Sequence, residues 1–271
     1  MKPLFKYAGG KRNEIQFIEP YLPLKYDKYI EPFMGGGALF FHLEPTKAII
    51  SENSIDVRNF YNTIKNDSRE LLREILNLSE KYPTEYQDRS DLYYNFRESE
   101  PTTNMEKAIR FYVLRQLSFS GMIRFNKKGD FNVPFGHYDK LLPITRHFEA
   151  LNRIFENTII LDDAFKALEL ATENDFVFLD PPYTRTFVEY HIDGQFGNKE
   201  HIKLANWFCN TKSKAMIVLN SDDFTLNLYG DYIKTKYGKK YAIEFMGRTK
   251  ESTNAEHFIA INYKQRQEGL F

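Results

Sequence analysis

The chain has 271 residues, and its 37 Lys and Arg balance 37 Asp and Glu, so the formal net charge is zero. This length suits one large domain, or one domain with a smaller domain inserted. A neutral total charge excludes a globally basic protein, so any surface for nucleic acid has to be local. The single cysteine, Cys209, excludes an internal disulfide and a cysteine metal cluster, and it fits a reducing compartment.

No apolar run approaches the length of a transmembrane segment, and the first residues do not form a signal peptide. We therefore expect a cytoplasmic protein that is monomeric in solution and that binds neither a membrane nor a metal.

The first motif covers residues 6–12, where Gly9 and Gly10 are flanked by Lys6, Tyr7 and Lys11. A glycine pair lets the backbone approach a ligand closely, and the lysines add positive charge beside it. The spacing is not that of a Walker A loop. The alternative for this segment is a flexible basic turn.

A short strand at residues 28–30 is followed by a turn that contains Phe33 and Gly35–Gly37, and then by a helix that begins at residue 38. Strand, glycine-rich turn and helix form the nucleotide-cofactor arrangement of doubly wound folds. The G-x-G-x-x-G spacing of dinucleotide sites is missing, so an adenosyl ligand without phosphates is the better fit.

Acidic residues follow three further predicted strands. Glu52 follows the strand at 47–51, in the position where such folds hold a ribose diol. Asp162 and Asp163 follow the strand at 158–161, and the run 176–179 leads into Asp180. In an open α/β sheet these strand ends surround the ligand crevice.

Asp180 opens the motif Asp180-Pro181-Pro182-Tyr183. The prolines donate no N–H and restrict φ, so the backbone carbonyls are held outward and can accept hydrogen bonds. An acid, fixed carbonyls and an aromatic ring suit a planar ring with an exocyclic amino group. The alternative is an ordinary turn at the end of a strand, with a packed tyrosine.

Strands at 214–219, 241–245 and 257–263 complete the sheet, the last two as a terminal hairpin. The alternation of strands and helices predicts a Rossmann-like, doubly wound α/β fold with a mostly parallel sheet. Residues 62–150 interrupt this alternation with helices at 62–99 and 107–118 and a β-hairpin at 119–136 that turns at 127–129. We therefore predict a catalytic domain of residues 1–61 and 151–271, with a recognition domain of residues 62–150 inserted.

Residues 105–150 hold eight Lys and Arg against four Asp and Glu. Basic residues interleaved with aromatic ones on a hairpin suit a groove of DNA. An ordinary solvated hairpin is the alternative.

Four motifs occur in a characteristic order: Lys-Tyr-Ala-Gly-Gly-Lys at 6–11, Glu-Pro-Phe-x-Gly-Gly-Gly at 31–37, Arg-Phe-Asn-Lys-Lys-Gly-x-Phe-Asn-Val-Pro-Phe-Gly at 124–136, and Asp-Pro-Pro-Tyr at 180–183. In this order the chain resembles the Dam-type DNA adenine-N6 methyltransferases (the α-class, or D12 family) over nearly its whole length. The resemblance implies a bacterial or phage enzyme that uses S-adenosylmethionine and acts on double-stranded DNA.

The resemblance also implies the roles of individual residues. Asp180 matches the catalytic acid, and Tyr183 matches the ring that stacks on the target base beside the Pro181 and Pro182 carbonyls. Contacts to S-adenosylmethionine are implied for the positions that match the cofactor motifs: Tyr7, Lys11, Phe33, Gly35, Gly36, Gly37, Glu52, one of Asp162 and Asp163, and Asp180.

On the DNA side, Phe119 matches an aromatic wedge in the duplex, and Arg124 matches an arginine that reads guanine. Lys6 and Pro134 match base-contacting positions. The family's Asn-Gly-Leu is replaced by Ser120-Gly121-Met122, which leaves the site open between GATC and a related sequence such as GATATC. The remaining DNA contacts that we expect are Ser120, Met122, Asn126, Lys127 and Asn132.

The expected reaction is direct transfer of a methyl group to the N6 of an adenine flipped out of the duplex. Three alternatives remain: a cytosine-N4 DNA methyltransferase, a DNA-binding protein with a decayed active site, and a methyltransferase for small molecules or proteins.

Overall fold

The structure of the protein is a computed structural model. The structure describes residues 1–5, 7, 9–124, 126, 131–145, 148–183, 196–240 and 254–264. Of the predicted site residues, Lys6 and Lys127 lie outside these ranges, as do the predicted turn at 127–129 and the predicted strand at 241–245.

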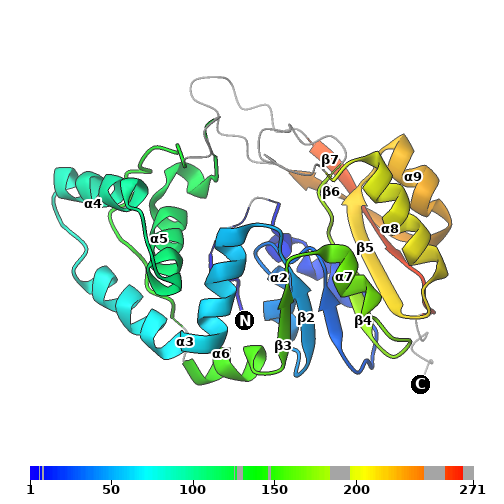
Figure 1. The fold of residues 1–271 in the computed structure, drawn as a ribbon. Helices are drawn as coiled ribbons and strands as arrows, with labels where there is room; N and C mark the ends of the chain where they lie inside the picture. Colours follow the sequence, from blue (N-terminus) through cyan, green and yellow to red (C-terminus); the bar gives the residue numbers. More distant parts are fainter. Residues whose placement is uncertain are drawn as a thin grey trace, which may run out of the picture.

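The described strands form one seven-stranded sheet in the order β3-β2-β1-β4-β5-β7-β6 (Figure 1). The first five in this order are parallel, whereas β7 runs antiparallel to both β5 and β6. The prediction of a mostly parallel, Rossmann-like α/β sheet is therefore confirmed. The strands are β1 (Tyr29–Glu31), β2 (Ala48–Ser51), β3 (Thr158–Leu161), β4 (Phe176–Leu179), β5 (Lys214–Asn220), β6 (Ile233–Lys240) and β7 (Asn254–Ile261).

The central strands are apolar runs because helices cover both of their faces. Ile30 of β1 lies level with Ile49 of β2 and Val177 of β4, and all three are buried. Such continuous apolar strands are typical of parallel sheets. Strand β1 pairs with β2 on one side and with β4, which comes later in the chain, on the other. In open α/β sheets, ligands bind outside the carboxyl ends of the strands at such a change of direction.

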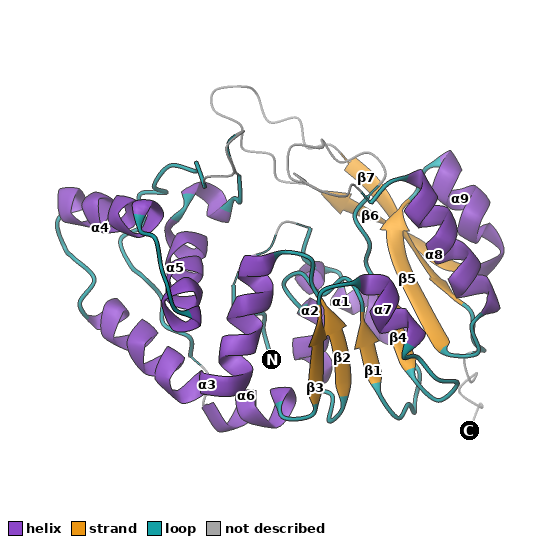
Figure 2. Cartoon of the chain, in the orientation of Figure 1, coloured by secondary structure: helices purple, strands orange, loops and turns teal. Residues whose placement is uncertain are grey.

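Two apolar cores lie on the two faces of the sheet, and Figure 2 shows the helices arranged around the strands. One contains residues of α2, α3, α5 and α6, and the other contains residues of α7, α8 and α9. The helices are α1 (Ile15–Ile18), α2 (Ala38–Leu43), α3 (Ile55–Glu80), α4 (Tyr86–Glu98), α5 (Asn104–Leu117), α6 (Phe148–Phe155), α7 (Ala164–Glu169), α8 (Asn198–Asn210) and α9 (Asp223–Tyr229), with short 3-10 helices η1 (Lys11–Asn13), η2 (Glu19–Tyr21), η3 (Phe119–Gly121) and η4 (Gly230–Tyr232).

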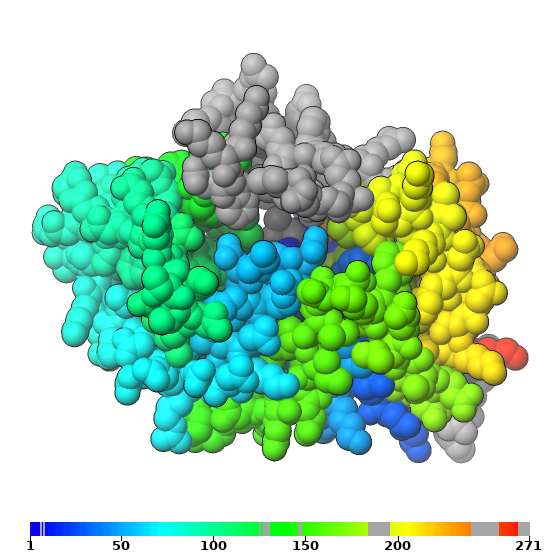
Figure 3. All heavy atoms as spheres, in the orientation of Figure 1, coloured from blue at the N-terminus to red at the C-terminus, as the bar shows by residue number. Residues whose placement is uncertain are grey.

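Helix α3 links the sheet to the helices that lie beyond it. It begins at Ile55 rather than at residue 62, and it bends at Asp67, whose φ of −136° is not helical. Helices α4 and α5 lie on the far side of α3 from the sheet (Figure 1), and α3 fills the space between α5 and α7 in the space-filling view (Figure 3). Because α3 runs through the predicted boundary at residue 62, the division into two domains stays a prediction.

The predicted hairpin at 119–136 is only partly regular. Ser118 and Phe135 form an antiparallel bridge, and Asn132 N donates to Arg124 O at 2.9 Å. The first arm, however, begins with the 3-10 turn η3 in place of a strand. Ser120 and Gly121 have φ of 53° and 62°, and these positive values bend the backbone away from an extended path.

Strand β6 was not predicted, because its sequence alternates lysines with small and polar residues instead of forming an apolar run. It lies at the edge of the sheet and pairs with β7 alone among the described strands. Lysines are common on edge strands, where they oppose pairing with other chains. Among the described helices, none is both long enough and apolar enough to cross a membrane.

Candidate active site

The motif Asp180–Tyr183 follows β4 directly, at the carboxyl edge of the sheet. All four residues of β4 are buried, which anchors the motif to the centre of the fold. The Asp180 side chain is 19% exposed, so its carboxylate is partly accessible at this edge of the sheet. The structure therefore places Asp180 where the sequence analysis expected it.

Lys11 connects the glycine-containing turn near the N-terminus to this motif. Its ammonium group donates to Asp180 Oδ1 at 2.5 Å, to the Tyr183 hydroxyl at 2.7 Å and to Gly9 O at 3.2 Å. The side chain is only 2% exposed, and these three acceptors match its three protons. Burial raises the pKa of Asp180, whereas the charge and hydrogen bond of Lys11 oppose that rise.

Two oxygen atoms of the motif differ from the rest in their hydrogen bonding, although Asp180 is partly exposed and Pro181 is buried. Within the described residues, no hydrogen bond reaches Asp180 Oδ2 or the Pro181 carbonyl. The Pro182 carbonyl differs, because Nε2 of the buried His201 lies 3.0 Å from it. A carbonyl can only accept a hydrogen bond, so Nε2 of His201 carries the proton.

The glycine-rich turn between β1 and α2 closes against Tyr7 and Glu52. A Cβ atom added to Gly35 or Gly36 would lie 2.8 Å from Tyr7 atoms, so both positions require glycine. Gly37 has a φ of 63° at the start of α2, in the left-handed region that favours glycine. A bulky residue at Gly36 would therefore clash with Tyr7 and displace it, and a ligand bound beside Tyr7 would be affected by that displacement.

Glu52 is a buried acid whose two oxygens face backbone amides. Gly35 N and Ser54 N each donate to it at 2.9 Å. Burial raises the pKa of Glu52, and these backbone hydrogen bonds oppose the rise. Phe33, in the same turn, packs edge-to-face against Phe196 at 5.2 Å. The structure thus brings the predicted cofactor residues of the first two strands together.

The acidic pair after β3 separates into two roles. Asp163 is the N-cap of α7, where its Oδ1 accepts from the backbone N–H groups of Phe165 and Lys166 at 2.7 and 3.0 Å. Asp162 is exposed, and its Oδ1 lies 3.3 Å from Lys166 Nζ. Because Asp163 is engaged by its own helix, Asp162 is the better candidate for a ligand contact.

The predicted DNA-contacting residues that the structure describes follow α5, from Phe119 to Pro134. Arg124 donates to the Asn132 side chain at 2.8 Å and to the Asn132 carbonyl at 3.0 Å, so these two residues bind each other across the two arms. Ser120 is exposed, and four more predicted residues are partly exposed: Phe119, Met122, Asn126 and Pro134.

Two buried acids close to the motif were not predicted. Glu31 accepts from the Tyr29 hydroxyl at 2.8 Å, and burial raises its pKa to about 8, so it is largely protonated at neutral pH. Glu14 binds residues of β6 and β7, among them His257, whose ring packs against Tyr183. The position of Glu31, as the last residue of the buried strand β1, could have marked it, whereas no local pattern distinguishes Glu14.

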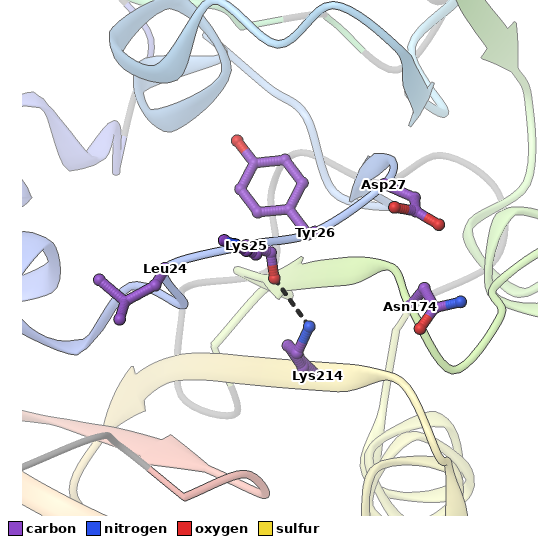
Figure 4. Close-up of a pocket in the computed structure, with 6 residues that line it drawn as sticks. All are labelled: Leu24, Lys25, Tyr26, Asp27, Asn174 and Lys214. Atoms are coloured by element: carbon purple, nitrogen blue, oxygen red, sulfur yellow. Dashed lines mark hydrogen bonds between the residues drawn. The ribbon is translucent and has the colours of Figure 1, made fainter.

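Two cavities lie elsewhere in the described structure. One of about 460 Å³ is bounded by the amino ends of β4 and β5 and by the segment before β1, and its lining residues are Leu24, Lys25, Tyr26, Asp27, Asn174 and Lys214 (Figure 4). The other, of about 730 Å³, lies between α3 and α6. Neither contains a predicted site residue. Within the part of the chain that the structure describes, no group of three His, Cys, Asp or Glu side chains could hold a metal ion.

The chain is similar to known proteins over most of its length. Residues 7–243 match the family model described as D12 class N6 adenine-specific DNA methyltransferase. The chain is 36% identical to the type II methyltransferase M.CviBI of Paramecium bursaria Chlorella virus NC1A, over 97% of this chain and 100% of that protein. It is 31% identical to the type II methyltransferase M1.LlaDCHI of Lactococcus lactis subsp. cremoris, over 86% of each chain. A DNA adenine methylase of Vibrio cholerae serotype O1 is 26% identical over 71% of each chain.

Proposed function

Because the chain belongs to the D12 class of N6 adenine-specific DNA methyltransferases, we propose that it methylates an adenine flipped out of duplex DNA, with S-adenosylmethionine as the methyl donor. The observation that carries this proposal is a pair of acceptors in the motif that ends at Tyr183, Asp180 Oδ2 and the Pro181 carbonyl, neither of which accepts a hydrogen bond from the described residues. An exocyclic amino group has two N–H donors, and this pair matches them.

The two acceptors would raise the reactivity of the amino nitrogen. The lone pair of adenine N6 is delocalised into the ring, which makes the nitrogen a poor nucleophile. Hydrogen bonds from both N–H groups to Asp180 and Pro181 favour a pyramidal nitrogen with a directed lone pair. Positioning of this kind and pre-oriented charge together lower the barrier.

The residues around the glycine-rich turn fit an adenosyl group. When bound, S-adenosylmethionine supplies a methyl group on a positively charged sulfur. A carboxylate can accept about four hydrogen bonds, so Glu52 can still bind ribose hydroxyls while it holds Gly35 N and Ser54 N. Gly35 and Gly36 leave the Tyr7 ring close to the turn, and Asp162 is exposed at the neighbouring strand end.

In this proposal Lys11 supports the residues that hold the target adenine, Asp180 and Tyr183, and does not bind the cofactor. The sequence analysis expected it to contact the cofactor, but all three of its protons are engaged by Gly9, Asp180 and Tyr183. We therefore assign it to holding Asp180 ionised and Tyr183 in place. After transfer, the methylated nitrogen carries one excess proton, which the Asp180 carboxylate is placed to accept.

Duplex recognition is assigned to the segment after α5. Arg124 would exchange its bond to Asn132 for guanine, while Phe119 fills the gap left by the flipped base. Contacts to neighbouring bases would come from Lys6, Ser120, Met122 and Pro134. Further contacts to the DNA would come from Asn126, Lys127 and Asn132. This assignment favours GATC or a related site.

We also propose that the enzyme acts as a monomer in the cytoplasm, where its DNA substrate lies.

The test is methyl transfer from tritiated S-adenosylmethionine to unmethylated duplex DNA, followed by nucleoside analysis. We expect the label in N6-methyladenine. Label in N4-methylcytosine, or no incorporation by the purified protein, would contradict the proposal. Sequencing of DNA from cells that express the protein would then identify the methylated site.

A further inference from the structure

Glu14, between η1 and α1, is a buried carboxylate that is only 3% exposed. Three donors surround it. His257 Nδ1 and the Tyr237 hydroxyl lie 2.8 and 2.7 Å from Oε2, and Lys239 Nζ lies 2.5 Å from Oε1. The donors belong to β6 and β7, so Glu14 ties the segment that carries Lys11 to the antiparallel end of the sheet. We call these four residues, Glu14, Tyr237, Lys239 and His257, the Glu14 cluster.

The charge of Glu14 fixes the direction of these hydrogen bonds. Burial raises the pKa of Glu14, but the hydrogen bond from His257 and the charges of Lys11 and Lys239 outweigh it and bring the pKa to about 2. The carboxylate is therefore ionised at neutral pH and can only accept. Nδ1 of His257 consequently carries a proton, and its bond to Glu14 sets the orientation of the imidazole ring.

The Glu14 cluster reaches the active site through His257. The rings of His257 and Tyr183 meet edge-to-face, with centroids 5.2 Å apart and an interplanar angle of 69°. The Tyr183 hydroxyl is held by Lys11 at 2.7 Å. Tyr183 is thus held at its hydroxyl from one side and at its ring from another.

We propose that Glu14 and His257 are positioning residues that orient the Tyr183 ring for stacking on the flipped adenine. This inference rests on the proposed function, which gives Tyr183 its stacking role. Base–aromatic stacking depends on the orientation of the ring, and small displacements of a reacting group lower the rate strongly. Among the described residues, the side-chain hydrogen bonds of Glu14 and the ring contact of His257 run to β6, β7 and Tyr183 and none to the glycine-rich turn. The effect should therefore fall on methyl transfer and not on cofactor affinity.

The experiment compares Glu14→Gln and His257→Ala with the wild-type enzyme. We expect kcat to fall about tenfold or more, with cofactor affinity within about twofold by calorimetry. A duplex with 2-aminopurine at the target position reports on the flipped base, because stacking on an aromatic ring quenches its fluorescence. We expect both variants to give a brighter complex than wild type, since the base loses its stacking partner.

Ser68→Ala is the matched control, because it removes a partly buried hydrogen bond from Ser68 to Asn152 that joins α3 to α6, away from the site. It should lower the melting temperature without changing kcat or the fluorescence. The proposal is overturned if Glu14→Gln and His257→Ala lose only stability, as Ser68→Ala does.

The proposed function can fail separately, if the wild-type enzyme leaves all DNA unmethylated. A crystal structure of His257→Ala then decides the role of the cluster. A displaced Tyr183 ring supports it, and a ring that keeps its place refutes it.

Discussion

Replacing Lys11 with methionine tests the side chain that donates hydrogen bonds to both Asp180 and Tyr183. The change keeps a long, buried side chain but removes the ammonium group that donates to Asp180 Oδ1 at 2.5 Å and to Tyr183 at 2.7 Å. A hydrogen bond to a charged group contributes about 1.5–3 kcal/mol. If that energy serves to keep Asp180 ionised and in place, kcat at neutral pH should fall about tenfold or more.

The pH dependence should move in a defined direction. Burial already raises the pKa of Asp180, and Lys11 opposes the rise, so its removal should raise that pKa further. The reaction needs an ionised carboxylate as acceptor, and activity is therefore lost as pH falls through this pKa. In Lys11→Met the loss should begin at a higher pH than in the wild type.

Single-turnover methyl transfer, followed from acidic to weakly alkaline pH, measures this shift. Lys28→Met is the matched control, because Lys28 Nζ lies 3.2 Å from the buried Asp175 at the amino end of β4, away from the motif. It should lower stability and leave the pH profile unchanged. The reasoning is refuted if the Lys11→Met profile coincides with that of the wild type, or if the variant loses only cofactor affinity.

Three further substitutions test separate parts of the site. Asp180→Ala should lower kcat more than tenfold, a barrier increase above about 1.4 kcal/mol, while fluorescence anisotropy shows unchanged DNA affinity; substantial remaining transfer would exclude Asp180 as the acceptor. Gly36→Val should weaken cofactor binding in calorimetry because its Cβ would lie 2.8 Å from Tyr7, whereas Gly238→Val, with nothing within 4 Å, should not; equal affinities would contradict the assignment of the turn. Arg124→Ala should relax discrimination at one base pair by ~1–3 kcal/mol, measured on duplexes substituted one pair at a time, and a uniform loss would instead indicate a phosphate contact.

Local sequence was sufficient for the parts of the site that are contiguous in the chain. The apolar run before Asp180 and the glycines after β1 place a carboxylate and a tight turn at strand ends, and both predictions depend only on neighbouring residues. The same reasoning failed for β6, because the polar sequence of an edge strand lacks the apolar pattern of a buried one. The 3-10 turn η3 was also not predicted. Its positive φ at Ser120 depends on the contacts of the folded loop and not on the neighbouring residues alone.

The sequence by itself determined the family resemblance, the order along the chain of the parallel strands and glycine turns, and the acids at the strand ends, because these follow from short-range patterns of burial and turn chemistry. Only the tertiary structure decided which polar side chains meet. Lys11 and Asp180 are 169 residues apart, and Glu14 and His257 are 243 residues apart. Such pairs form because the sheet brings the N-terminal segment, β4 and β7 to one edge, and a buried lysine or glutamate has the same sequence signature as a solvated one. The pairing of Arg124 with Asn132 was decided in the same way, by the packing of two arms of one loop.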